Sequence, residues 1–576
     1  MDASTMNLPD DRLGAPPAAL RGRRALVLAL NLISYVLLGV MMVRVLGGDG
    51  LSIPALCFLL LFLLGLPWTL LGFWNAVIGF VIARLVTDPA RYTNPALART
   101  ALDAPITAMT AICLMIRHED VTPCFARLGA MIDDIDASGA GDHFTFHVLS
   151  DSQLPDAIAD EAAAFARLRD GRNRPDAIIY RRREANTGFK AGNMRAFATT
   201  ARDTHDYMIV LDADSMMSAD AMLRLVRVMQ ANDRLGILQS LVVGRPAASG
   251  FARIFQFGMR HAMRMQTVGT AWWQGPSGPF WGHNAIIRLR PFVDCCDLPV
   301  IPGRGPLRGD LLSHDQVEAV LMRIAGYEVR VIADEFGSSE ENPPDILEFI
   351  KRDLRWCQGN MQYIHLMRLP GLQPMGRFQL INAIMMYVGA PLNFLMLMSG
   401  LAIAFTGTGR GFATGLAFAL YLIVMAMIFA PRLLGVVDVL LRPGASRRYG
   451  GRGRLLTGVI IDLVFSLCLG SIMLVIQALF MLSLALGRRA GWQAQNRAAR
   501  RIGLAAFART LWPVMLYGAF AGLVLAAVAP GALPWAVPTI GPCLAVVPFA
   551  ALSAQPGIGA WLARHHVCAI PEEVAS

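Results

Sequence analysis

The chain has 576 residues, 55% of them hydrophobic, and a net charge of +10 from 52 lysines and arginines against 42 acidic residues. A mean hydropathy of +0.46 is too apolar for a purely soluble enzyme. No basic helix or aromatic stacking platform favours nucleic acid as a partner. We therefore expect a membrane protein of two or more domains, whose positive charge suits an anionic membrane surface.

Two apolar segments near the amino terminus, residues 25–46 and a second within 51–83, predict membrane-spanning helices. Three arginines precede the first segment, so the positive-inside rule predicts a cytoplasmic amino terminus. That apolar stretch is too long for a cleavable signal peptide. Residues 1–85 are thus expected to form a cytoplasmic amino terminus and two transmembrane helices.

Residues 86–377 have the composition of a soluble domain, and their place between the second and third spans predicts a cytoplasmic location. Strand-like apolar runs alternate there with helical stretches such as 156–169 and 219–230, which predicts a mostly parallel sheet covered by helices. Ligands of such sheets bind at the carboxyl ends of the strands. The expected strands are residues 108–116, 143–149, 177–180, 207–211, 235–241 and 327–333.

Residues 378–555 return to the membrane, with spans expected at 380–405, 413–430, 511–529 and 533–552. The apolar residues 455–486 are flanked by arginines on both sides, so a single crossing would leave one basic cluster outside. We expect a re-entrant or interfacial helical pair broken at Gly470-Ser471. This gives six full crossings, with eight as the alternative. Residues 556–576 are expected to be a cytoplasmic tail.

Asp212-Ala213-Asp214 directly follows the apolar run 207–211. Two carboxylates at a strand end can hold Mg²⁺ or Mn²⁺ against a diphosphate, because hard cations take both kinds of oxygen together. Such a tripeptide also occurs in solvated turns. In that reading Asp214 caps the helix that starts near Ser218. The tripeptide alone leaves both readings open.

Other motifs occur around this tripeptide in a characteristic order. They are Arg117-His-Glu-Asp120, Asp151, Gly188-Phe-Lys-Ala-Gly-Asn193, Phe280-Trp-Gly-His-Asn284, Ser313-His-Asp-Gln316, Arg352-Asp-Leu-Arg-Trp-Cys-Gln-Gly-Asn360 and Arg442-Pro-Gly-Ala-Ser-Arg-Arg-Tyr-Gly-Gly451. Their order and spacing resemble the processive, membrane-embedded family 2 glycosyltransferases, which include cellulose, chitin and hyaluronan synthases. Over residues 90–500 they resemble more closely the glucans biosynthesis glucosyltransferase H family, which makes osmoregulated periplasmic glucans.

The resemblance implies an α/β GT-A glycosyltransferase domain inserted in an α-helical transmembrane domain. It implies a hexosyltransferase that uses UDP-glucose and Mg²⁺ or Mn²⁺. For the donor, it implies that Glu119 and Asp151 contact uridine and that Lys190 supplies a cation to the diphosphate. It also implies that Asp212 and Asp214 bind the metal and that Arg355 binds pyrophosphate. For Asp151, capping of the helix after Pro155 is the rival reading.

For the acceptor, the resemblance implies Asp315 as general base in a Ser-His-Asp motif, where the wider family has Thr-Glu-Asp or Glu-Asp. His314 is read as a helix-terminal residue, with a positioning role as the alternative. Trp356 is expected to stack on acceptor glucose, unless an amphipathic helix buries it. Arg352 stands where the synthases carry Gln. The expected acceptor wall is Phe280, Trp281 and His283, and Trp272-Trp273 are assigned either to it or to the bilayer interface.

The segment 487–496 lies where related synthases place a gating loop over the nucleotide pocket. Trp492 and Gln493 are its expected contacts, since a loop that closes over a site excludes water. The rival reading is an interfacial anchor with Trp492 among the lipid headgroups.

We therefore expect an inverting, processive glucosyltransferase of the bacterial inner membrane that makes and translocates a β-1,2-linked periplasmic glucan. The alternatives are a cellulose-like β-1,4-glucan synthase and a lipid-phosphate glycosyltransferase, and the second class typically lacks the Arg355-Trp356 motif. A transporter would leave the large soluble domain unexplained. Expected partners are UDP-glucose, the growing glucan and inner-membrane lipid. Acyl carrier protein is a further candidate, for which the basic residues 488–501 offer a surface.

Overall fold

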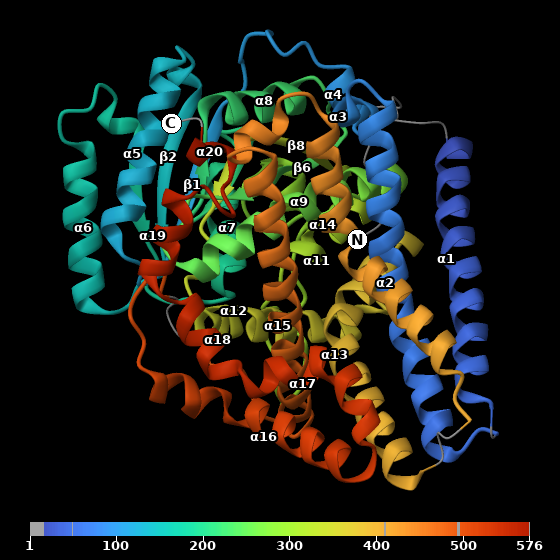
Figure 1. Ribbon diagram of the computed structural model, residues 1–576. Coiled ribbons are helices and arrows are strands. Elements are labelled where there is room, and N and C mark those ends of the chain that lie inside the picture. The colour runs from blue at the N-terminus through green and yellow to red at the C-terminus, as the bar shows by residue number, and fades with distance from the viewer. Residues whose placement is uncertain (1–16, 49, 408–410, 492–495, 575–576) are drawn as a thin grey trace.

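In chain order, an α/β domain is inserted between two sets of long helices in the computed structural model, which describes residues 17–48, 50–407, 411–491 and 496–574. The two sets of helices pack against one another (Figure 1). The domain follows α1 (Pro17–Leu46) and α2 (Ile53–Leu85) and ends with α12 (Ile346–Met361). The helical carboxyl-terminal part follows α12.

Eight strands form one mixed sheet in the order β3-β2-β1-β4-β7-β6-β8-β5. The first four are parallel to one another, β7 is antiparallel to both its neighbours, and β6 and β8 are parallel. Six of these strands are predicted by the sequence, whereas the short β5 and β7 are not. The strands are β1 (Thr110–Ile116), β2 (Phe144–Ser150), β3 (Ile178–Arg182), β4 (Tyr207–Asp212), β5 (Met216–Met217), β6 (Leu235–Gly244), β7 (Ala285–Arg288) and β8 (Glu328–Glu340).

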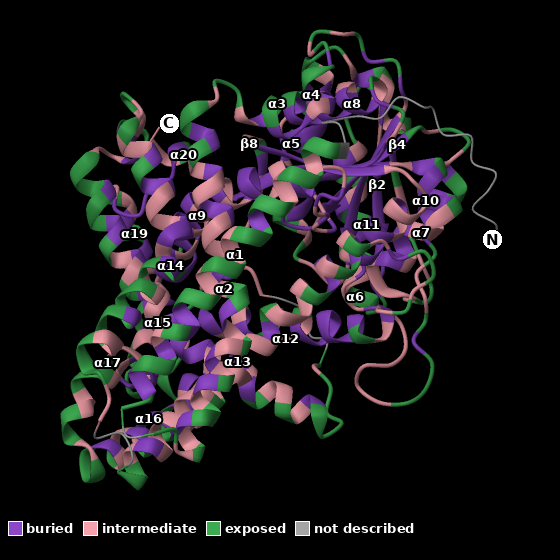
Figure 2. Cartoon of the chain, turned by 90° about the vertical axis from the view of Figure 1, so that its right-hand side faces the viewer, coloured by how far each residue is buried: buried purple, intermediate pink, exposed green. Residues whose placement is uncertain are grey.

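Both faces of the sheet are covered, which explains why its strands read as continuous apolar runs. In β1, Ile112 and Leu114 belong to one apolar core, while Ala111 and Cys113 belong to the other. Successive side chains of a strand point to opposite faces, so one strand feeds two cores. Figure 2 shows the sheet as the most continuously buried part of the chain. Helices on one face include α5 (Val121–Ala137), α6 (Pro155–Arg169) and α8 (Ala219–Gln230), and those on the other include α7 (Phe189–Ala201), α10 (Leu289–Cys295) and α11 (Asp315–Ile324).

Six helices of the described chain are long and apolar enough to cross a membrane, and a bent helix pair could add a seventh span. Many of their leucines face outward, such as Leu32 at 53% exposure, which a lipid environment accommodates. The chain is thus a multi-pass membrane protein with an inserted α/β domain, as predicted. The six are α1, α2, α13 (Pro374–Thr406), α14 (Thr414–Leu441), α15 (Arg452–Ala485) and α16 (Leu504–Val528).

The expected break at Gly470-Ser471 is wrong, because α15 is a single helix of 34 residues that counts among the six spans. The alternative of eight crossings is not found either. One interior glycine costs a helix only about 1 kcal/mol relative to alanine. The break lies instead within the expected span 533–552, where α17 (Leu533–Leu544) and α18 (Val546–Ser553) are bent by 58°. Pro538 and Pro542 lie inside α17, and proline removes helix hydrogen bonds.

The domain is joined to the membrane helices by α9 (Gly250–Gln274), which packs along α2 and α14. The backbones approach closely, since a Cβ on Gly79 of α2 would lie only 1.8 Å from the Met265 carbonyl oxygen. The carboxyl-terminal helix α20 (Pro571–Val574) follows α19 (Pro556–Arg564) and also contacts α9 through ion pairs from Glu573 to Arg253 and from Glu572 to Arg260. The predicted tail is therefore docked on α9.

Candidate active site

The carboxyl end of β4 delivers the two predicted metal carboxylates. Asp212 is the last residue of the strand, and its N–H donates to Ser215 Oγ (3.0 Å), which folds the chain into a tight turn. Asp214 lies in this turn and is buried. Ser218 caps α8 by accepting from the Ala221 N–H (3.2 Å), so the helix-capping reading of Asp214 is wrong.

Lys190 of α7 contacts the same strand end. Its ammonium group donates to Asp212 Oδ1 and to the Gly282 carbonyl oxygen, the latter at 2.8 Å. Burial raises the pKa of Asp212, but Lys190 and His283 outweigh burial and hold that pKa well below its usual range. A Cβ on Gly192 would lie 2.0 Å from the Thr187 carbonyl oxygen, so the tight start of α7 requires glycine there.

Arg497 is the residue of this cluster that we did not predict. Its guanidinium pairs with Asp214 and, at 3.2 Å, with Glu119 from the loop after β1. Burial raises the pKa of Glu119, and Arg497 opposes this shift. In the sequence Arg497 is one arginine of a basic run, and nothing local distinguishes it from its neighbours.

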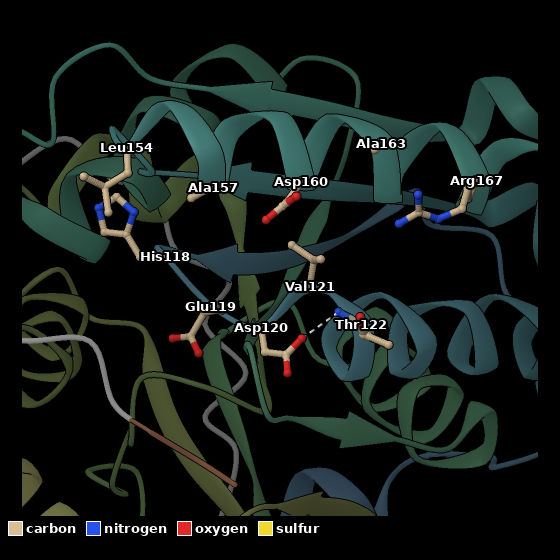
Figure 3. A pocket seen from close by; sticks show the side chains of 10 residues that line it. All are labelled: His118, Glu119, Asp120, Val121, Thr122, Leu154, Ala157, Asp160, Ala163 and Arg167. Carbon is tan, nitrogen blue, oxygen red and sulfur yellow. Dashed lines mark hydrogen bonds between the residues drawn. The ribbon is translucent and has the colours of Figure 1, made fainter.

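Glu119 also lines a cavity of about 480 Å³ between the loop after β1 and helix α6. Figure 3 shows Glu119 and Asp120 on one side of this cavity and Asp160 and Arg167 of α6 on the other. Asp120 caps α5 by accepting from the Thr122 N–H (3.0 Å). Glu119 is therefore the acidic group that links the cavity to the Asp214 cluster.

Asp151, at the end of β2, is buried and accepts two hydrogen bonds from Arg183, at 2.7 and 2.9 Å. It does not cap α6, whose N-cap residue is Leu154. The capping alternative is therefore wrong, and Arg183 is a partner that the sequence did not indicate.

Asp315, the predicted base, is the first residue of α11. A Cβ on Gly282 would lie 3.4 Å from Asp315 Cβ and 3.8 Å from His314 Cε1. Since Lys190 binds the carbonyl of the same glycine, Asp315 and Lys190 both lie next to Gly282. His314 is buried, and its Nδ1 lies 2.8 Å from Glu318 Oε2.

The motif around Gly282 is only partly an open wall. Trp281 is half-buried, and His283 Nε2 lies 3.3 Å from Glu340 Oε2. Phe280 is 1% exposed and packs in the core, so the expectation that it lines the acceptor wall is wrong.

Trp272 and Trp273 lie on α9 and pack toward the first two helices of the chain. The Trp273 indole N–H donates to Asn75 Oδ1 of α2 (2.9 Å), and the Arg23 guanidinium of α1 lies over the Trp272 ring. Both tryptophans thus join α9 to the membrane helices.

Helix α12 carries Arg355 and Trp356. The Trp356 side chain is 49% exposed, so the reading in which an amphipathic helix buries it is wrong. The Arg352 guanidinium lies 4.7 Å from the centre of its ring. Burial lowers the pKa of Arg355, and the neighbouring arginines Arg352 and Arg497 lower it further, while Glu119 raises it. Arg355 therefore belongs to the same charged region as these groups.

Trp492 and Gln493, the predicted gating contacts, lie outside the described residues. The chain on either side of them is bound to the domain: the Ala490 N–H donates to Gln358 Oε1 (2.7 Å), and the Asn496 N–H donates to Glu348 Oε2 (3.2 Å).

A divalent metal fits this site by its donor set. Among the described residues no three side chains of the ligand types converge on one point, so protein alone does not complete a coordination shell. Asp212 and Asp214 supply two hard oxygen donors beside Lys190, and a bound diphosphate would supply others.

Three comparisons place these observations among known proteins. Residues 207–431 match the model of glycosyl transferase family group 2. A glucans biosynthesis glucosyltransferase H from Xylella fastidiosa is 31% identical over 93% of this chain and 85% of its own length. One from Xanthomonas oryzae pv. oryzae is 33% identical over 92% and 84%. A solved mannosyltransferase from Pyrobaculum calidifontis, in complex with GDP-Man and Mn²⁺, aligns with 66% of this chain and 99% of its own at 15% identity, with a TM-score of 0.41.

Proposed function

This chain belongs to the glucans biosynthesis glucosyltransferase H family, and on that premise we propose an inverting, processive enzyme that transfers glucose from UDP-glucose to a β-1,2-linked glucan. In this proposal the α/β domain faces the cytoplasm of a bacterial inner membrane, and the membrane helices conduct the product to the periplasm. A catalytic site beside the helices suits a glucan that is exported while it is being lengthened.

The observation that carries the proposal is the convergence of two kinds of group at Gly282. Lys190 binds the carbonyl of this residue and contacts Asp212, while Asp315 lies beside the same residue. A glycosyl transfer needs a cationic, metal-binding group at the leaving diphosphate and a base at the attacking hydroxyl. The site offers both groups, because Lys190 and Asp315 each lie next to Gly282.

The residues then act as follows. Asp315 accepts the proton of the acceptor hydroxyl as its oxygen bonds to the anomeric carbon of glucose. The bond from that carbon to the diphosphate breaks, and its electron pair leaves with UDP. Lys190 and Arg355 stabilise the charge that develops on the diphosphate. Bound Mg²⁺ or Mn²⁺, held by Asp212 and Asp214, would supply Lewis-acid stabilisation of the same charge.

Five further side chains are proposed to bind the remaining parts of the substrates. Glu119 and Asp151 accept hydrogen bonds from uridine, and Glu119 does so at the edge of the cavity described above. Trp281, His283 and Trp356 bind acceptor glucose, for which the exposed Trp356 ring offers a flat apolar face.

The segment with Trp492 and Gln493 is proposed to close over the bound nucleotide, between the anchored positions Ala490 and Asn496. Inner-membrane lipid and acyl carrier protein are the further proposed partners. The exposed Arg488 belongs to the basic surface that would meet the acidic protein.

Linkage analysis of the product tests the proposal. Purified protein in detergent with UDP-glucose and Mg²⁺ or Mn²⁺ should release UDP and build a β-1,2-linked glucan, whereas Asp315→Asn should do neither. A product dominated by β-1,4 linkages would assign the chain to a cellulose-like synthase. Glucose transferred only to a lipid phosphate would assign it to the lipid-directed class, and no UDP release with any sugar nucleotide would refute the enzyme.

A further inference from the structure

His314, which directly precedes Asp315 and is the N-cap residue of α11, forms a buried pair with Glu318 in the first turn of that helix. The His314 Nδ1 and Glu318 Oε2 atoms are 2.8 Å apart, and the two side chains are 9% and 1% exposed. Their spacing of four residues places them on one face of the helix. A carboxylate as deeply buried as that of Glu318 is energetically costly without a partner. The pairing with this carboxylate therefore holds the His314 imidazole in a fixed orientation.

The ring orientation directs the other nitrogen of His314 toward the site. Nδ1 faces Glu318, and Cε1 lies 3.8 Å from the position of a Cβ on Gly282. Nε2 follows Cε1 around the ring, on the edge away from Glu318. Within the described part of the chain Nε2 has no hydrogen-bond partner.

The charges around the imidazole favour a donor at Nε2. Burial lowers the pKa of His314, but Glu318 and Asp315 outweigh burial, and the net shift is upward. Lys190 acts in the opposite direction, and the Tyr363 hydroxyl, which also faces this turn, donates to the Ser313 carbonyl (2.9 Å). An imidazolium beside a carboxylate has both ring N–H groups available to donate, one to Glu318 and one outward.

Resting on the proposed function, we propose that the His314 Nε2–H binds a hydroxyl oxygen of the acceptor sugar beside the hydroxyl that Asp315 deprotonates. His314 thereby selects which acceptor hydroxyl is glucosylated. The hydroxyls of a glucose ring are chemically similar, so their selection depends on which of them is held at the base. A hydrogen bond to the neighbouring hydroxyl orients the ring in this way. Glu318 is the positioning residue that fixes the imidazole.

The substitutions His314→Gln and Glu318→Gln test this inference, with His143→Gln as a matched control. His143 precedes β2 at the amino end of the strand, away from Asp315. In the full-length protein, His314→Gln should keep UDP affinity, raise the KM for an oligoglucan acceptor about tenfold, as expected for one lost hydrogen bond, and yield mixed linkages. Hydrolysis of UDP-glucose by water should increase relative to transfer of glucose to the glucan. Glu318→Gln should change the same quantities in the same direction, and His143→Gln should change none.

The outcomes separate this inference from the proposed function. If wild type makes a single linkage and His314→Gln makes the same linkage with unchanged acceptor KM, the pair is only structural and the inference is wrong. If wild type releases no UDP, the proposed function and the inference fall together. If His314→Gln loses UDP binding and hence its fold, Glu318→Gln decides by the same linkage analysis.

Discussion

Arg497, in the loop that follows α15, forms an ion pair with Asp214 at the end of β4. The same guanidinium reaches Glu119 on the edge of the cavity beside α6. Arg497 directly follows the segment proposed to gate the site, and it contacts both the proposed metal carboxylate and the proposed uridine carboxylate. In the proposed function, nucleotide and metal have to displace Arg497 from these two carboxylates.

Substitution of this arginine should strengthen metal binding. In Arg497→Gln a tethered cation no longer competes for Asp214, and we expect Mn²⁺ affinity without nucleotide to rise about fivefold, or about 1 kcal/mol for one partly screened ion pair. Electron paramagnetic resonance titration of free Mn²⁺ measures this affinity. Arg500→Gln is the control, since Arg500 pairs with Glu348 (3.6 Å) and not with Asp214. Equal affinities in both variants would show that Arg497 does not compete with the metal.

Base and metal carboxylates should separate in their effects on binding and chemistry. Asp315→Asn should lower turnover at least about a hundredfold while UDP affinity stays near that of wild type, because a base is needed only in the transition state. Asp214→Ala should lose metal-dependent UDP binding as well. Calorimetric UDP titration with and without Mn²⁺ distinguishes the two. Substantial activity in Asp315→Asn would require another base.

Loss of the exposed indole of α12 should weaken the acceptor interaction. Trp356→Ala should raise the KM for glucan acceptor about tenfold and leave the KM for UDP-glucose near that of wild type, since stacking contributes about 1 kcal/mol. Trp561 of α19 is similarly exposed, at 50%, and Trp561→Ala serves as the control. Equal effects of the two substitutions would point to membrane anchoring in place of acceptor binding.

Stability in detergent should fall between about pH 4 and pH 6 because of one buried carboxyl group. Burial raises the pKa of Asp353 in α12 to about 6, with a hydrogen bond from Gln477 (2.7 Å) opposing the shift. The folded state thus holds this proton above the pH at which the unfolded chain releases it, and unfolding becomes easier as the pH rises through this window. The loss is on the order of 2 to 3 kcal/mol.

Asp353→Asn should weaken this dependence, whereas Asp176→Asn, at a side chain that is 99% exposed, should leave it unchanged. Melting temperatures of the three proteins at pH 4, 5, 6 and 7 provide the test. Identical pH profiles for wild type and Asp353→Asn would exclude the assignment.

The sequence predicts most of the sheet because its strands contain apolar runs of about four residues or more. β5 and β7 escape prediction because two and four residues carry no periodicity, and they pair antiparallel within a sheet whose other strands are mainly parallel. Helix α9 escapes for another reason. Arg253 and Arg260 are buried in it, where an apolar residue is expected, and their partners are far away in the chain.

The candidate site follows the same division. Asp212, Lys190 and Asp315 stand in recognisable motifs, and the structure brings them to one glycine. Arg497 and Arg183 could not be predicted, because their roles depend on long-range ion pairs and not on local spacing. The helix break lies after Pro538 and Pro542 and not at Gly470-Ser471, because proline removes helix hydrogen bonds whereas glycine keeps them.

The docking of α20 on α9 has a consequence for how the protein is made. Arg253 and Arg260 are buried in α9, between the α/β domain and the membrane helices, yet Glu573 and Glu572 are synthesised more than 300 residues later, after every membrane helix described above. Until they leave the ribosome and reach α9, Arg253 lacks its ion-pair partner and Arg260 keeps only its pair with Glu335. The order of translation thus makes insertion of the final helices a precondition for a mature catalytic domain. A chain that stops before α20 keeps Arg253 buried without its counter-charge, which is energetically costly.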